Sequence, residues 1–210
     1  MITLYDYSRA PSPRRARILL AEKGMAHETV EIDMMTAEQM GEAYRAINPN
    51  CTIPALALED GTILNDNAGI TAWAEAIRPE PALLGTTPLE KAEIASWNAR
   101  IEGEGMMAIA EALRNSTPAM KDRALPGPHN YAQIPELAER GQARLNAFFD
   151  MLNARLEGRD YVATNRFSLA DITAVVTVDF ARAVRVKPGE AHGNLIAWRA
   201  RMAERPSMSL

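Results

Sequence analysis

The chain has 210 residues, with 23 Lys and Arg against 27 Asp and Glu, so its net charge is −4. That balance argues against nucleic acid as a partner, because binding to phosphates needs a basic face. The single cysteine excludes a disulfide framework and fits a reducing compartment, and no apolar run approaches the roughly 18 residues of a membrane span. We therefore expect a cytoplasmic protein that binds neither nucleic acid nor a membrane.

The first segments predict a strand, a loop and a helix. Residues 2–5 are a short apolar run rich in β-formers, which is typical of a buried strand. Ser12 stands where an N-cap is expected, Pro13 suits the first helical position, and Gly24 ends a helix over residues 13–23. A hydroxyl would then lie at the positive end of this helix.

The following residues continue the alternation of strands and helices. Residues 27–32 alternate polar and apolar side chains as a strand does, and Thr36 is expected to cap a helix that ends near Ile47. Asp60 and Gly61 predict the turn of a β-hairpin, whose strands are residues 54–58 and 62–64.

Asn65 or Asp66 is expected to cap a third helix, which runs to Ile77. The order of elements is then β-α-β-α-β-β-α. This order is that of an α/β domain with a mixed four-stranded sheet, and we assign it to residues 1–78.

The composition changes after residue 78. Prolines and a glycine mark a linker over residues 79–88, and nothing beyond it resembles a strand. Apolar residues then recur at helical spacing, and Ser168 with Asp171 makes a capping box that opens a helix. Residues 89–210 are therefore predicted to form an all-α helical bundle. The spaced residues are Ile94, Trp97, Ile101 and Ala108 in one helix, Leu145, Phe148, Phe149, Leu152 and Leu156 in another, and residues 195–203 in the last.

Five short motifs follow one another along the whole chain. They are residues 12–24, 48–56, 65–70, 168–172 and 204–207. Each motif is weak alone, but their order and spacing together resemble a cytosolic glutathione S-transferase of bacterial type. The resemblance implies a thioredoxin-like N-terminal domain followed by a helical domain. It also implies glutathione as co-substrate and a transferase activity.

Glutathione has a thiol, a zwitterionic γ-glutamyl group and a glycyl carboxylate, and Ser12 suits the thiol. A hydroxyl bond to the thiolate contributes about 1.5–3 kcal/mol, and a helix N-terminus adds about 0.3–1 kcal/mol. Together they would lower a thiol pKa of about 8.5 by about 1 to 3 units. The alternative is that Ser12 only caps the helix, a role that is compatible with donating to a thiolate. Tyr5 and Tyr7 are rival hydroxyls, since some relatives use a tyrosine near the end of the first strand.

The next candidates for binding glutathione lie at the start of the third strand and are Cys51, Thr52, Ile53 and Pro54. We predict a cis peptide bond between Ile53 and Pro54, which would leave the Ile53 N–H and C=O unpaired. In the family these two groups clasp the cysteinyl part of glutathione like an added strand, and the alternative is an ordinary trans proline. Cys51, in the same segment, is expected to be a small buried residue rather than a nucleophile. Thr52 replaces a lysine that the family often uses for the glycyl carboxylate.

Asp66 and Asn67 stand where the family has an acidic residue followed by serine. There the acid faces the γ-glutamyl ammonium, and free N–H groups at the helix start hold the carboxylate. Simple capping of the helix is the alternative. In place of the missing lysine, Arg14, Arg15 or Gln39 would hold the glycyl carboxylate.

The second substrate is expected in an apolar pocket between the domains. Its candidate residues are two from the loop before Ser12 and three from the first long helix. The three histidines have no ligand spacing between them, so no metal site is expected. The pocket candidates are Tyr7, Arg9, Gly105, Met106 and Met107.

Two functions of different classes remain open. The first is an enzyme of detoxification that conjugates glutathione to a small apolar electrophile, or uses it for reduction, isomerisation or dehalogenation. The second is a non-catalytic module that carries ligands or binds proteins. We also expect a homodimer, because relatives pair these elements and the chain has more apolar surface than one helical domain needs. That surface is assigned to Ile70, Trp73, Ile94, Trp97 and Ile101.

Overall fold

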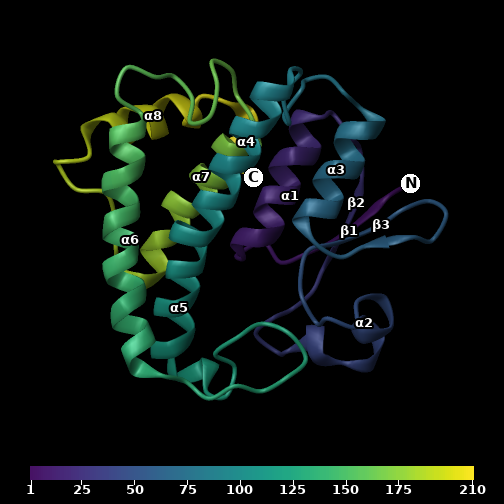
Figure 1. Ribbon diagram of the computed structural model, residues 1–210. Helices are drawn as coiled ribbons and strands as arrows, with labels where there is room; N and C mark the ends of the chain where they lie inside the picture. The colour runs from purple at the N-terminus through teal and green to yellow at the C-terminus, as the bar shows by residue number, and fades with distance from the viewer. The chain divides into compact units, whose positions relative to one another are not determined.

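The computed structural model describes residues 1–210, which divide into two units (Figure 1). The first unit contains Met1–Pro81, Leu125–His129 and Leu210, and the second contains Ala82–Ala124 and Asn130–Ser209. The chain first passes from one unit to the other inside the proline-rich segment. None of the helices combines the length and the apolar character needed to cross a membrane.

A mixed four-stranded sheet lies in the first unit, with the strand order β2-β1-β3-β4. β1 is parallel to β2 and antiparallel to β3, and β3 is antiparallel to β4. The predicted sheet and its hairpin are therefore confirmed. The strands are β1 (Thr3–Asp6), β2 (Glu28–Glu31), β3 (Ala55–Ala57) and β4 (Ile63–Leu64).

Three α-helices and a short 3-10 helix complete the first unit. α1 and α3 lie side by side, and α2 follows the 3-10 turn between β2 and β3 (Figure 1). Fully buried Leu4, Leu56, Ile18 and Ile70 show that both helices contribute to one core with the sheet. The helices are α1 (Pro11–Glu22), the 3-10 helix Glu38–Met40, α2 (Glu42–Ile47) and α3 (Asn67–Ile77).

The predicted start of α1 is wrong by two residues. The helix begins at Pro11, and its N-cap is Ala10, which has extended backbone angles and no side-chain cap. Both Pro11 and Pro13 fit the first turn, where a missing N–H breaks no intrahelical bond. The helix starts at the first of these two prolines. Ser12 lies inside the first turn rather than before it.

The caps of the other two helices have opposite outcomes. The Asp66 cap of α3 is confirmed, because its Oδ1 accepts a hydrogen bond of 2.6 Å from the Gly69 N–H. Thr36 caps no helix: its hydroxyl donates to the Asp33 carbonyl at 3.1 Å, and α2 starts after Gly41. The Thr36 hydroxyl bonds to a backbone carbonyl three residues earlier instead of a helix N–H, which is a common alternative for threonine.

A buried lysine joins the C-terminal ends of α1 and α3. The Lys23 side chain has no exposed surface and pairs with the Glu75 carboxylate. Its Nζ also donates to the carbonyls of Arg78 at 2.8 Å and Pro81 at 2.6 Å. A buried ammonium is stable only when it is paired in this way. Lys23 therefore fixes the chain where it leaves α3.

The second unit is a helical bundle without strands, as predicted. One long helical stretch contains α4, a π-helical turn and α5, and it packs with α6 and α7 within this unit. α8 follows after a loop. The helices are α4 (Pro88–Arg100), the π-helical turn Ile101–Met106, α5 (Met107–Ser116), α6 (Pro135–Arg155), α7 (Leu169–Phe180) and α8 (Gly193–Ala203). Short 3-10 helices cover Pro118–Met120, Ala181–Val184 and Pro206–Ser209.

The predicted capping box of α7 is confirmed. Asp171 accepts from the Ser168 N–H at 3.1 Å and from the Ser168 hydroxyl at 3.0 Å. Its other oxygen accepts from the Val162 N–H at 2.8 Å, so the box also holds the preceding loop. Burial raises the pKa of Asp171 to about 6, although these hydrogen bonds act in the opposite direction.

Two glycines allow the helices of the second unit to approach closely. A Cβ on Gly105 would lie 2.7 Å from Thr177 Cγ2 and 2.9 Å from Phe148 Cζ. A Cβ on Gly141 would lie 2.6 Å from the Ala108 carbonyl oxygen. These distances are shorter than van der Waals contact, so only glycine fits at either position without movement of its neighbours.

The apolar surface that we assigned to a dimer interface is mostly core. Ile70 and Ile101 have no exposed surface and Ile94 has 1%, so these side chains pack within their own units. Trp97 is half-buried, and the Arg155 guanidinium lies 4.7 Å from its ring centroid. These isoleucines therefore give no support to the predicted homodimer, which stays a prediction.

Candidate functional site

Ser12 presents two hydrogen-bond donors at the start of α1. Its backbone N–H lies in the first turn, where no intrahelical acceptor exists. The neighbouring residues offer no free backbone N–H. Pro11 and Pro13 have no N–H, and the Ala10 N–H donates to the Tyr7 carbonyl at 2.9 Å. The Ser12 hydroxyl has no hydrogen-bond partner and does not cap the helix. Both groups are available to an anion at the positive end of α1.

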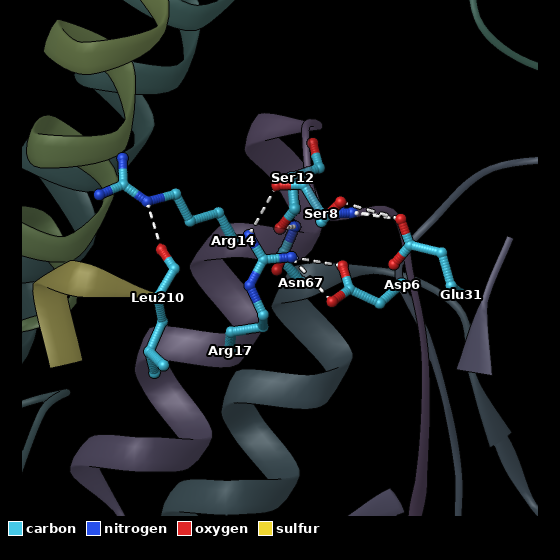
Figure 2. Close-up of polar contacts among 8 residues, drawn as sticks. All are labelled: Asp6, Ser8, Ser12, Arg14, Arg17, Glu31, Asn67 and Leu210. Atoms are coloured by element: carbon cyan, nitrogen blue, oxygen red, sulfur yellow. Dashed lines mark hydrogen bonds and ion pairs between the residues drawn. The ribbon is translucent and has the colours of Figure 1, made fainter. Parts of the chain in front are cut away.

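The N-terminus of α3 lies beside Ser12. The Asn67 side chain donates to the Ser12 carbonyl at 3.1 Å, which fixes the two helix starts to each other (Figure 2). This bond uses one of the two Asn67 amide hydrogens, and the backbone N–H groups of Asn67 and Ala68 are further donors for a ligand. Asp66 is exposed, and its Oδ2 carries no hydrogen bond from the cap.

The peptide bond between Ile53 and Pro54 is cis. The Ile53 N–H and C=O have no partner in the protein, because β3 begins only at Ala55. The Ile53 side chain packs in one apolar cluster with Tyr7 and Ala10, which places this segment against the loop before Ser12. Three separate segments of the first unit thus meet around the start of α1.

The carbonyl before Ile53 is held by two residues that the sequence did not single out. The Tyr44 hydroxyl and the Asn48 amide each donate to the Thr52 carbonyl at 2.7 Å. Burial raises the pKa of Tyr44 to about 12, so its hydroxyl keeps its proton near neutral pH. Nothing in the sequence indicates that the Tyr44 hydroxyl bonds to a backbone carbonyl eight residues away. This support for the Thr52 carbonyl could therefore be found only in the structure.

A second set of residues that the sequence did not single out fixes the loop between β1 and α1. Arg17 Nη1 lies 2.5 and 2.8 Å from the two carboxylate oxygens of Asp6, and Arg17 Nη2 donates to the Ser8 carbonyl at 3.1 Å (Figure 2). The Ser8 N–H and hydroxyl both donate to Glu31 Oε1, at 3.0 and 2.9 Å. Asp6 is 2% exposed, so this ion pair is shielded from water. It sets the path of the chain into Ser12.

Gln39 lies in the 3-10 helix and is 8% exposed. Its Oε1 is buried and has no hydrogen-bond partner. A buried polar atom without a partner costs about 1–3 kcal/mol, so a ligand N–H would be favoured here.

Arg14 and Cys51 already have partners within the first unit. Arg14 Nε donates to the Leu210 carbonyl at 2.8 Å (Figure 2). Cys51 is 3% exposed, and its Sγ accepts from Arg45 Nε at 3.3 Å, as fits a small buried residue. The Gln39 Oε1 atom can only accept, so through this atom Gln39 would bind a ligand N–H rather than the glycyl carboxylate.

The predicted second-substrate residues are divided between the units. Tyr7 is half-buried in the Ile53 cluster, and Arg9 is exposed. In the second unit, Met106 is half-buried and Met107 is 49% exposed. Gly105 is buried against α6 and α7. Its assignment to a pocket is therefore corrected to helix packing.

Comparison with known families agrees with this architecture. Residues 10–77 match the glutathione S-transferase N-terminal domain, and residues 111–206 match the glutathione S-transferase C-terminal domain. Glutathione S-transferase 2 of Saccharomyces cerevisiae is 34% identical over 208 residues, covering 98% of this chain and 87% of the yeast protein. The chain therefore belongs to the glutathione S-transferase family of enzymes.

Two solved structures show how far the likeness extends in space. The crystal structure of Gtt2 from Saccharomyces cerevisiae has a TM-score of 0.90 at 32% identity, covering 99% of this chain and 98% of that one. A glutathione transferase homologue from Sulfitobacter, crystallised with bound glutathione, has a TM-score of 0.83 at 25% identity. This match covers 100% of this chain and 95% of the homologue.

Proposed function

We propose that residues 1–78 bind glutathione and that Ser12 stabilises its thiolate for attack on a small apolar electrophile. The observation that supports this most is the pair of free donors on Ser12, at the start of α1 and bonded through its carbonyl to α3. A thiolate at this position would accept from both the hydroxyl and the N–H. The Sulfitobacter homologue with bound glutathione supports the choice of ligand.

The other contacts would orient the tripeptide. The Ile53 N–H and C=O would pair with the cysteinyl backbone as an added strand does. The free N–H groups of Asn67 and Ala68 would hold the γ-glutamyl carboxylate, and Asp66 Oδ2 would face its ammonium. The buried Gln39 oxygen would accept the N–H of the glycyl residue. Each contact uses an atom that has no partner within the protein.

The chemistry follows from the lowered thiol pKa. The thiol loses its proton to solvent before the reaction, and the sulfur then uses a lone pair to form a C–S bond. In a substitution the electron pair of the broken bond departs with the leaving group, and in an addition it becomes a carbanion that water protonates. Ser12 stays protonated throughout, because its role is to donate to the charged sulfur.

We also propose that the enzyme acts as a homodimer in the cytoplasm, as the family resemblance implies. The first test of the proposed function is activity with glutathione and an activated aryl chloride. Formation of the thioether at a rate above that of the uncatalysed reaction supports it. Glutathione binding without any turnover, over a range of electrophiles, would favour the non-catalytic alternative.

A further inference from the structure

The second unit has a hollow of about 340 Å³ between the end of α7 and α8. The chain turns there through the 3-10 helix Ala181–Val184 and through Arg185, whose φ of 60° lies in the left-handed region. Residues 186–188, which follow this turn, also line the hollow. This volume lies within the range of about 300–1,000 Å³ that is typical of small-molecule sites.

The floor of this hollow is apolar and partly uncovered. Leu195 is fully buried and Val178 is 8% exposed, so both belong to the core of the second unit. Ile196 lies beside them in α8 but is 47% exposed. An apolar group seated in the hollow would remove the Ile196 side chain from water, at a gain of about 25 cal/mol for each Å² covered.

The charged groups of the hollow are mostly basic, in a chain whose net charge is −4. Asp179 and Arg199 neutralise each other through two hydrogen bonds of 2.8 Å. Arg182 uses only Nε, which donates to the Asp179 carbonyl at 2.8 Å, and its two terminal nitrogens have no acceptor. Lys187 is exposed and has no partner. Two positive charges therefore line the hollow without a paired carboxylate.

We propose that this hollow binds a small organic carboxylate with an aromatic or branched aliphatic body. The terminal nitrogens of Arg182 suit the two oxygens of a carboxylate, and Lys187 adds a second charge. The apolar body would lie over Ile196. An inorganic anion would leave Ile196 in water, and a neutral apolar molecule would leave both cations unused. All these residues belong to the second unit, so this site does not depend on glutathione binding by the first.

The test measures binding of 2-naphthoate by titration calorimetry, with backbone amide chemical shifts to locate the ligand. Binding should shift the amides of Arg182, Lys187 and Ile196, and it should persist when glutathione is present at saturation. The neutral 2-naphthamide and inorganic phosphate should each bind at least about tenfold more weakly, a difference of about 1.4 kcal/mol.

The matched variants change the same total charge at two places. Arg182→Gln with Lys187→Gln should weaken binding of 2-naphthoate at least about tenfold. Lys91→Gln with Lys121→Gln, at two exposed lysines outside the hollow, should leave it unchanged. Absence of binding, equal loss in both double variants, or displacement by glutathione would overturn the assignment. Equal affinity for 2-naphthamide would do the same, because the cations would then have no part in binding.

Discussion

Replacing Ser12 by alanine removes a hydroxyl and leaves the rest of the proposed site in place. The backbone N–H at this position stays, and so does the carbonyl that accepts from Asn67 at 3.1 Å. The hydroxyl neither caps α1 nor bonds to any other group of the protein. Alanine also has a higher helix propensity than serine. We therefore expect the free energy of unfolding to change by less than about 0.5 kcal/mol.

The effect on bound glutathione should be much larger. The lost bond is a hydroxyl donor to a charged sulfur, which contributes about 1.5–3 kcal/mol. The pKa of the bound thiol should therefore rise by about one to two units, since each unit corresponds to 1.36 kcal/mol. Turnover at neutral pH should fall about ten- to a hundredfold. Glutathione affinity should change much less, because the Ile53 backbone and the N-terminus of α3 remain.

Thiolate absorbance of bound glutathione, followed against pH, measures this pKa directly. Ser8→Ala is the matched control. It removes a nearby hydroxyl that bonds to Glu31 and is not proposed to contact the ligand. Ser12→Thr should retain a low pKa because it keeps the hydroxyl. If Ser12→Ala titrates like the parent and Tyr7→Phe does not, the reasoning is refuted and Tyr7 is the thiolate donor.

Four further predictions follow from the structure. Arg17→Met should lower the unfolding free energy in urea by about 3–5 kcal/mol, because it leaves Asp6 buried without its cation. Gly105→Ala should lower the melting temperature, at a cost of about 1–3 kcal/mol, whereas Gly103→Ala should not, since nothing lies within 4 Å of its Cβ. Burial raises the pKa of Asp171 from 3.8 to about 6, so stability from this group is present below about pH 4 and is lost as pH rises through about 6. Urea unfolding should show this loss, of about 3 kcal/mol, and Asp171→Asn should abolish it. Light scattering should give twice the chain mass of 23.1 kDa, and a monomer mass at micromolar concentration would contradict the homodimer.

Local signals in the sequence predicted the fold well. The Asp60-Gly61 turn, the Asp66 cap and the Ser168–Asp171 capping box depend on residues within a few positions of each other, and each formed as predicted. Ser12 and Thr36 failed as caps because a neighbouring residue offered an equally good local solution. For α1 that solution was a second proline, and for Thr36 it was the Asp33 carbonyl.

Contacts between distant segments could not be found this way. The Asn67 amide bonds to the Ser12 carbonyl 55 residues away, and Arg17 reaches back to Asp6. The sequence predicted Gly105 as a pocket residue, and only its packing against Thr177 and Phe148 shows why no side chain fits there. The residue types at the proposed site were predictable, whereas the bonds that hold them were not.

Binding of glutathione itself is the most direct test of the proposed site. Thermal unfolding would be compared in buffer, in millimolar glutathione, and in the same concentration of the α-linked tripeptide Glu-Cys-Gly. The α-linked peptide has the same thiol and net charge but cannot place its groups at Ser12, Ile53 and α3 together. We predict that glutathione stabilises the protein and the α-linked peptide does not. The gain in unfolding free energy should be about 2.7 kcal/mol at about 100 times the dissociation constant of glutathione. No change with glutathione, or an equal change with both peptides, would contradict the site.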